Sequence, residues 1–155
     1  MSVVQQRLQE LGLVLPCAPT PVANYVPTII FGNELRTSGQ IPMRDGQLQF
    51  KGTVPSCQSV EEAQEAARLC GLNALAAASS ALDGDLDQIT RVLQLRVYIA
   101  SDSDFDGHST VANGVSDLMV AIFGDAGRHT RVAMGANTLP LGATVEVEAV
   151  FQIKT

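Results

Sequence analysis

The amino-acid sequence predicts an α+β fold in which two long helices pack on one face of a β-sheet. The C-terminal stretch from Thr144 to Ile153 alternates with a period of two, which indicates a strand with one buried face. Two longer stretches carry small or apolar residues at helical spacing, and segments typical of strands separate them. The order is helix, strand, strand, short strand, helix, strand, helix, strand, strand, which is typical of an α+β sheet.

The N-terminal region predicts a short helix followed by a β-hairpin. Ser2 can cap a helix that runs to Leu11, and Gly12 ends it. Three prolines then favour an extended link, so residues 1–20 form a helix and linker ahead of the sheet. Residues 25–31 and 34–38 are the expected hairpin strands around a Gly-Asn turn.

The middle of the chain contains the clearest helix. A short strand at residues 48–50 precedes it. Ser59 and Glu62 form a capping box, in which each side chain accepts from the other residue's backbone N–H. Alanines at helical spacing would let this helix lie close to a neighbour, until Asp83-Gly84-Asp85 ends it. Residues 89–100 are rich in β-branched and large side chains and predict a strand.

The last third predicts a second amphipathic helix and two strands. The helix spans residues 105–123, and a loop at residues 124–127 follows it. Arg131 opens one strand, and Leu139-Pro140-Leu141-Gly142 interrupts the chain before the final strand. We expect the final strand to be the antiparallel neighbour of the Arg131 strand, which would bring the guanidinium near Glu146 or Glu148.

Composition and charge narrow the function classes. The net charge is −6, with 16 acidic and 10 basic residues and no basic block, which disfavours nucleic-acid binding. Three cysteines without C-x-x-C spacing and only two histidines support neither a disulfide framework nor a metal site, and fit a reducing cytoplasm. No signal peptide is evident, and no segment approaches the roughly 18 unbroken apolar residues of a membrane span.

Four short motifs, in this order, resemble the RidA/YjgF family of enamine and imine deaminases, also described as L-PSP endoribonuclease-like. They are Asn24-Tyr25 before a strand, the run Thr37-Ser38-Gly39-Gln40-Ile41-Pro42, Asp104-Phe105 with Val111-Ala112-Asn113, and Arg131 followed by Leu139-Pro140 and Val145-Glu146-Val147-Glu148-Ala149. The resemblance covers nearly the whole chain after about Pro21 and suggests a longer-chain branch of the family.

The resemblance implies one chorismate-mutase-like α+β domain over residues 1–155, with a mixed sheet of about six strands. It implies a homotrimer with clefts between subunits, and hydrolysis of 2-imino or enamine acids to a 2-oxo acid and ammonia without a cofactor. By position, Arg131 matches the arginine that holds the substrate carboxylate, and Glu146 matches the glutamate beside the reacting water. Tyr25, Ser38 and Asn113 match residues that line or support the cleft.

The chain departs from the family pattern around Arg131. Ala133 replaces the common cysteine, although its backbone N–H can still hold substrate, and His129 replaces a proline. Both histidines are interpreted as surface residues. Three functions stay open: a deaminase, a trimer that binds a small metabolite without turnover, and, against the acidic charge, a ribonuclease. Whether Glu146 or Glu148 handles the water also stays open.

Overall fold

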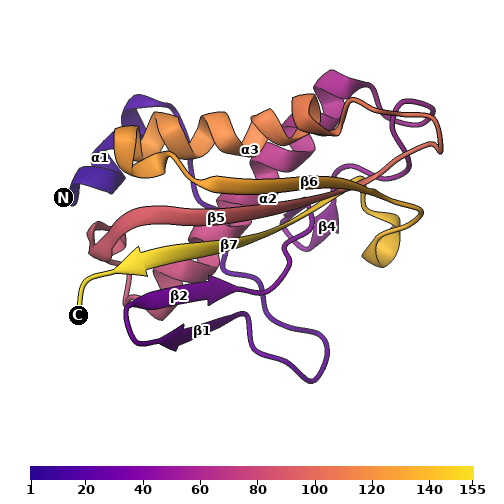
Figure 1. Ribbon diagram of the computed structural model, residues 1–155. Helices are drawn as coiled ribbons and strands as arrows, with labels where there is room; N and C mark the ends of the chain where they lie inside the picture. The colour runs from indigo at the N-terminus through magenta and orange to yellow at the C-terminus, as the bar shows by residue number, and fades with distance from the viewer.

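The structure, a computed structural model, describes residues 1–155 and consists of a five-stranded sheet with helices on one face (Figure 1). A separate two-stranded ladder lies outside the main sheet. The helices are α1 (Val3–Glu10), α2 (Val60–Ala81) and α3 (His108–Phe123), with 3-10 turns η1 (Leu86–Gln88), η2 (Gly124–Gly127) and η3 (Pro140–Gly142). The strands are β1 (Thr28–Phe31), β2 (Glu34–Thr37), β3 (Met43–Arg44), β4 (Gln47–Leu48), β5 (Ile89–Ala100), β6 (Thr130–Ala136) and β7 (Val145–Ile153).

The strand order of the main sheet is β1-β2-β7-β5-β6. β5 and β6 are parallel, and every other neighbouring pair is antiparallel. The prediction that the Arg131 strand neighbours the Glu146 strand is wrong, because β5 lies between β6 and β7. The reason is that α3 carries the chain from β5 back to the start of β6, and a crossover through a helix returns a strand parallel to the one it left.

Helices α2 and α3 cover one face of the sheet and lie close to each other. A Cβ on Gly71 of α2 would come within 2.7 Å of the Val115 side chain of α3, and one on Gly114 of α3 would overlap the Gln64 carbonyl of α2. The two glycines therefore set the spacing of the helix pair. The alternating apolar residues of β7 are buried beneath it, as the period of two predicts: Val145, Val147, Ala149, Phe151 and Ile153.

The N-terminal helix is anchored at both its start and its buried face. Ser2 and Gln5 form the capping box of α1. The Asp87 carboxylate also accepts hydrogen bonds from the Val3 and Val4 N–H groups at 2.8 and 2.9 Å. Val4 and Leu8 join the core. Figure 1 shows α1 beside the end of α3. The expected helix is confirmed. Its contact with Asp87 was not predicted, because Asp87 lies far from α1 in the sequence.

Several predicted boundaries move in the structure. The strand expected at residues 25–31 begins only at Thr28, because residues 23–25 turn and the Tyr25 N–H donates to the Ala23 carbonyl. The helix expected from Phe105 begins at His108, after a turn in which the Phe105 N–H donates to the Asp102 carbonyl. The loop expected at residues 124–127 is the 3-10 turn η2. None of the helices combines the length and the hydropathy that a bilayer crossing demands.

Candidate functional site

Arg131 is fixed at the edge of the sheet by α3. Its Nη1 donates to Asn113 Oδ1 at 2.8 Å and to Ser116 Oγ at 3.1 Å, and its Nη2 donates to the Ser109 carbonyl at 3.4 Å. A guanidinium carries five N–H donors. The Nε hydrogen and one Nη2 hydrogen therefore make no hydrogen bond within the protein. Nε and Nη2 flank one edge of the guanidinium, and an edge of this kind can hold a carboxylate with two parallel bonds.

Ser116, which bonds to Arg131, is itself held by His129. His129 Nδ1 lies 2.6 Å from the Gly127 carbonyl, which only accepts, so the geometry assigns the ring proton to Nδ1. His129 Nε2 then accepts from the Ser116 hydroxyl at 2.9 Å, and Ser116 in turn accepts from Arg131. His129 is half-buried and braces the arginine, which corrects its interpretation as a surface residue.

The free edge of β6 adds a backbone donor beside Arg131. The Ser101 N–H donates to the Ala136 carbonyl, so the Ala136 peptide groups face β5. Successive residues of a strand point their peptide groups to opposite sides, which turns the N–H and C=O groups of Ala133 outward. β6 is the last strand of the sheet, and these groups have no strand to pair with. Ala133 therefore has an outward-facing N–H that can donate to a substrate, as expected.

A second cluster lies at the end of β2. The Ser38 hydroxyl donates to the Val26 carbonyl at 2.6 Å, and the Ser38 N–H donates to the Pro27 carbonyl at 2.8 Å. These bonds tie the loop that carries Tyr25 to the sheet. The Tyr25 side chain is 52% exposed, so it lines an open surface and does not pack in the sheet.

Glu146 lies against this second cluster. A Cβ on Gly39 would overlap Glu146 Oε1 and come within 2.9 Å of Cδ, so the carboxylate occupies the space that the glycine leaves. Burial, followed by the nearby Glu148 charge, raises the pKa of Glu146 above its ordinary value. A carboxylate with a raised pKa is a stronger base than an ordinary one, which suits it to take up a proton from water.

Glu148 differs from Glu146 in its contacts. Its Oε1 accepts from Arg96 Nη1 at 3.2 Å and from the Tyr98 hydroxyl at 2.9 Å. The Glu146 carboxylate accepts no hydrogen bond from the protein, which leaves its oxygens available to a ligand or a water molecule. The sequence left open whether Glu146 or Glu148 handles the water, and these contacts favour Glu146.

The two clusters do not meet within one chain. Arg131 is in register with Leu95 of β5, which is in register with Ala149 of β7, and Glu146 lies three residues before Ala149. Two strand spacings and three residues along a strand correspond to a separation of roughly 14 Å between the Cα atoms. Successive side chains of a strand point to opposite faces of the sheet. Arg131 therefore lies on the face that the helices cover, and Glu146 lies on the other face. The expectation of a guanidinium beside this carboxylate is therefore wrong for a single chain.

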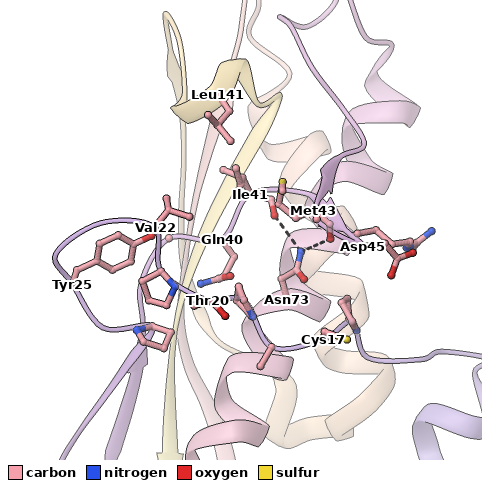
Figure 2. Close-up of a pocket in the computed structure, with 18 residues that line it drawn as sticks. Cys17, Thr20, Val22, Tyr25, Gln40, Ile41, Met43, Asp45, Asn73 and Leu141 are labelled. Carbon is pink, nitrogen blue, oxygen red and sulfur yellow. Dashed lines mark hydrogen bonds between the residues drawn. The ribbon is translucent and has the colours of Figure 1, made fainter.

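A cavity of about 400 Å³ adjoins the second cluster, because Tyr25 and Gly39 both line it. Figure 2 shows Tyr25 at one side of this cavity. Its other walls come from the segment before Tyr25, from residues after Gly39 and from Asn73 of α2. Sequence reasoning missed Ser116, the dependence of Glu146 on Gly39, and Asn73. An asparagine inside an alanine-rich helix was the only local signal for Asn73.

Comparisons with known proteins agree with this fold. The family model described as "YjgF/chorismate_mutase-like, putative endoribonuclease" matches residues 5–152. Protein TCP17 of Trypanosoma cruzi is 42% identical over 151 residues, which cover 97% of this chain and 94% of that protein. The crystal structure of Atu1372, a protein with unknown function from Agrobacterium tumefaciens, is 44% identical with a TM-score of 0.92, and the match covers 98% of this chain and 93% of that one.

A further crystal structure, described as a "putative endoribonuclease" from Shewanella oneidensis, is 33% identical with a TM-score of 0.93 and a match over 97% of this chain and 99% of that one. The predicted α+β, chorismate-mutase-like fold is thereby confirmed, with five strands in the main sheet. The resemblance drawn from the four sequence motifs is confirmed as well: this chain belongs to the YjgF/chorismate mutase-like family.

Proposed function

We propose that this protein hydrolyses 2-imino acids and their enamine tautomers to 2-oxo acids and ammonia. The observation that carries the proposal is the guanidinium of Arg131, which three hydrogen bonds to α3 hold in place and which keeps two N–H hydrogens without a partner in the protein. A planar fork of this kind matches a carboxylate better than the point charge of a lysine. Binding the carboxylate fixes the position of the imine carbon next to it.

The reaction needs one group that moves a proton twice. Water attacks the imine carbon, its oxygen forms the new C–O bond, and Glu146 accepts the proton that water loses. Glu146 then returns that proton to the nitrogen, which gives a carbinolamine with an NH2 group. Glu146 next takes the hydroxyl proton and passes it to the same nitrogen, so the C–N bond breaks, the C=O bond of the 2-oxo acid forms and ammonia leaves. The raised pKa of Glu146 suits both transfers. Imines hydrolyse readily in water, so positioning supplies most of the acceleration that is required.

The other predicted site residues have supporting roles in this scheme. Asn113 orients Arg131 through its side-chain oxygen, and the Ala133 N–H offers the carboxylate a further donor at the free edge of β6. Tyr25 and Ser38 line and brace the Glu146 side of the cleft. No step requires a cofactor.

A homotrimer with clefts between its subunits brings the two clusters together. The sheet face away from the helices exposes large apolar side chains, among them Ile29 at 60% and Phe31 at 85%. Val132 and Met134 of β6 are also exposed on that face. A surface of this kind favours contact with other copies of the chain. A monomeric mass in sedimentation equilibrium would contradict the shared cleft.

The test generates a 2-imino acid in situ with an amino-acid oxidase, in the presence of semicarbazide to trap free imine. Wild-type protein should lower semicarbazone formation and raise ammonia release, and Arg131→Ala should do neither. Arg128→Ala is the matched control, because Arg128 contacts only exposed Asp125 through its side chain. Equal rates for the wild type and Arg131→Ala reject the proposal.

Two further measurements separate the other two functions. Ala133 lacks the side chain of the family's cysteine, which is the feature that favours a trimer binding a metabolite without turnover. Tight binding of a 2-oxo acid without any hydrolysis would select that function. Cleavage of RNA by protein free of nuclease contamination would select the ribonuclease, against the net charge of −6.

A further inference from the structure

The cavity beside Tyr25 is built mainly from three parts of the chain, and Leu141 of η3 adds to its lining. Residues 16–22, which follow α1 and its loop, form one wall, and residues 39–46 form another. Asn73 contributes from α2 in the interior. The prolines of the first wall, together with Ile41 and Met43, make most of the lining apolar. Figure 2 shows Gln40 and Asn73 between Tyr25 on one side and Met43 and Asp45 on the other.

Two amide oxygens in this cavity have no partner. Asn73 is 2% exposed, and its Nδ2 donates to the Ile41 and Met43 carbonyls at 3.1 and 3.0 Å, which fixes the orientation of the amide. Gln40 is 6% exposed, and its Nε2 donates to the Ser38 carbonyl at 3.2 Å. Neither Asn73 Oδ1 nor Gln40 Oε1 accepts a hydrogen bond from the protein.

These oxygens face the cavity. The structure has no sealed side-chain nitrogen or oxygen without a hydrogen-bond partner, so both oxygens must reach open space. Both residues line this cavity and are otherwise enclosed. An apolar chamber with two acceptors suits a ligand with an apolar body that carries a neutral O–H or N–H donor. The rim charges of Arg44 and Asp45 are of opposite sign and favour neither an anion nor a cation.

The cavity also shares two residues with the proposed reaction site. Gly39 and Tyr25 line it, and Glu146 packs directly against Gly39. A substrate held beside Glu146 therefore lies next to this space, with Gly39 common to both. Its volume of about 400 Å³ is far larger than a methyl or ethyl side chain needs.

We propose that this cavity is a side-chain subsite that selects 2-imino acids with an aromatic side chain bearing a neutral hydrogen-bond donor, a phenol or an indole. The proposal rests on the proposed hydrolysis of 2-imino acids and names its substrate class. A subsite that pairs with a hydroxyl discriminates against the analogue that lacks it, because the acceptors are then left buried and unpaired. The imino acids of tyrosine and phenylalanine differ by that hydroxyl alone.

The experiment compares kcat/KM for the imino acids derived from tyrosine, phenylalanine and alanine. We expect the wild type to favour the tyrosine-derived over the phenylalanine-derived substrate by at least about tenfold. Gln40→Met should remove most of this preference. Thr20→Trp, at an exposed position of the cavity wall, should lower kcat/KM for both aromatic substrates by about tenfold or more and leave the alanine-derived substrate unchanged.

The alanine-derived substrate separates this proposal from the proposed function. If it is hydrolysed while the two aromatic substrates are equal and insensitive to Thr20→Trp, the subsite is refuted and the hydrolase stands. If no imino acid is hydrolysed, calorimetry with 4-hydroxyphenylpyruvate and phenylpyruvate still decides. Tighter binding of the hydroxylated acid, lost in Thr20→Trp, supports the subsite, and equal binding overturns it.

Discussion

Substituting Gly39 by alanine should move the Glu146 carboxylate while leaving the fold in place. The new Cβ would overlap Glu146 Oε1 and lie 2.9 Å from Cδ. Carbon atoms in contact prefer separations of about 3.5–4.0 Å, so the carboxylate has to shift by roughly 1 Å. Gly39 does not adopt a positive φ, and alanine therefore fits its backbone. The half-buried Glu146 side chain, which has no hydrogen-bond partner, is the part that yields.

The effect of such a displacement on the reaction rate can be estimated. Misplacing a catalytic group by about 1 Å costs on the order of a hundredfold in rate. We expect Gly39→Ala to lower kcat for 2-imino acid hydrolysis by about that factor, with a small change in KM because Arg131 is untouched. The free energy of unfolding should change by less than about 1 kcal/mol, since only a mobile side chain adjusts.

The decisive control is the same substitution in a Glu146→Gln background. If Gly39 acts through the Glu146 carboxylate, its loss should add little to a variant that already lacks that group. Steady-state kinetics of the two single variants and the double variant give the answer. The reasoning is refuted if the double variant loses kcat by the product of the two single-variant factors. It is also refuted if Gly39→Ala turns over substrate at the wild-type rate.

Three further predictions concern charge. Arg131→Lys replaces a fork by a point charge and should lower kcat/KM about 10- to 100-fold in the coupled assay, mostly by raising KM; an unchanged KM contradicts the fork. Because burial and Glu148 raise the pKa of Glu146, turnover should fall with decreasing pH through a pKa above that of an ordinary carboxyl, and Glu148→Gln should move this limb to lower pH. Partial burial raises the pKa of Asp87, but the Val4 and Val3 N–H groups outweigh it, so the pKa is lowered overall. Asp87→Asn should therefore unfold at lower denaturant concentration at pH 7, and the difference should vanish as pH falls through that lowered pKa.

The raised pKa of Glu146 also predicts how the stability of the fold depends on pH. The folded protein binds the Glu146 proton more tightly than the unfolded chain does, so ionised Glu146 opposes folding. Its penalty is absent below the unfolded pKa and is fully present above the raised folded pKa. Glu146→Gln should thus leave stability unchanged at low pH and raise it at neutral pH.

The fold was largely predictable because its signals are local. The alternation in β7 and the capping box at Ser59 depend on neighbouring residues, and both predicted elements are present. The pairing of β6 was not predictable in this way. Two strands that follow each other along the chain suggest a hairpin, whereas the crossover through α3 places β6 on the far side of β5.

The residues of the candidate site could be proposed from sequence motifs, but their geometry could not. The motifs named Arg131 and Glu146, yet no local pattern could show that a strand separates them. The Ser116 and His129 contacts behind Arg131 join residues from different elements, so the sequence offered no signal for them. Gly39 acts through the space it leaves beside Glu146, which only coordinates reveal.

The central claim is that Arg131 of one copy and Glu146 of a neighbouring copy share a cleft. Arg131→Ala and Glu146→Gln should each be inactive alone, and co-expressed as equal amounts in mixed assemblies they should complement each other. A cleft then receives an intact Arg131 half of the time and an intact Glu146 half of the time, so the mixture should show about a quarter of the wild-type turnover. Activity no greater than that of the separate variants, in assemblies shown to contain both, would contradict the shared cleft.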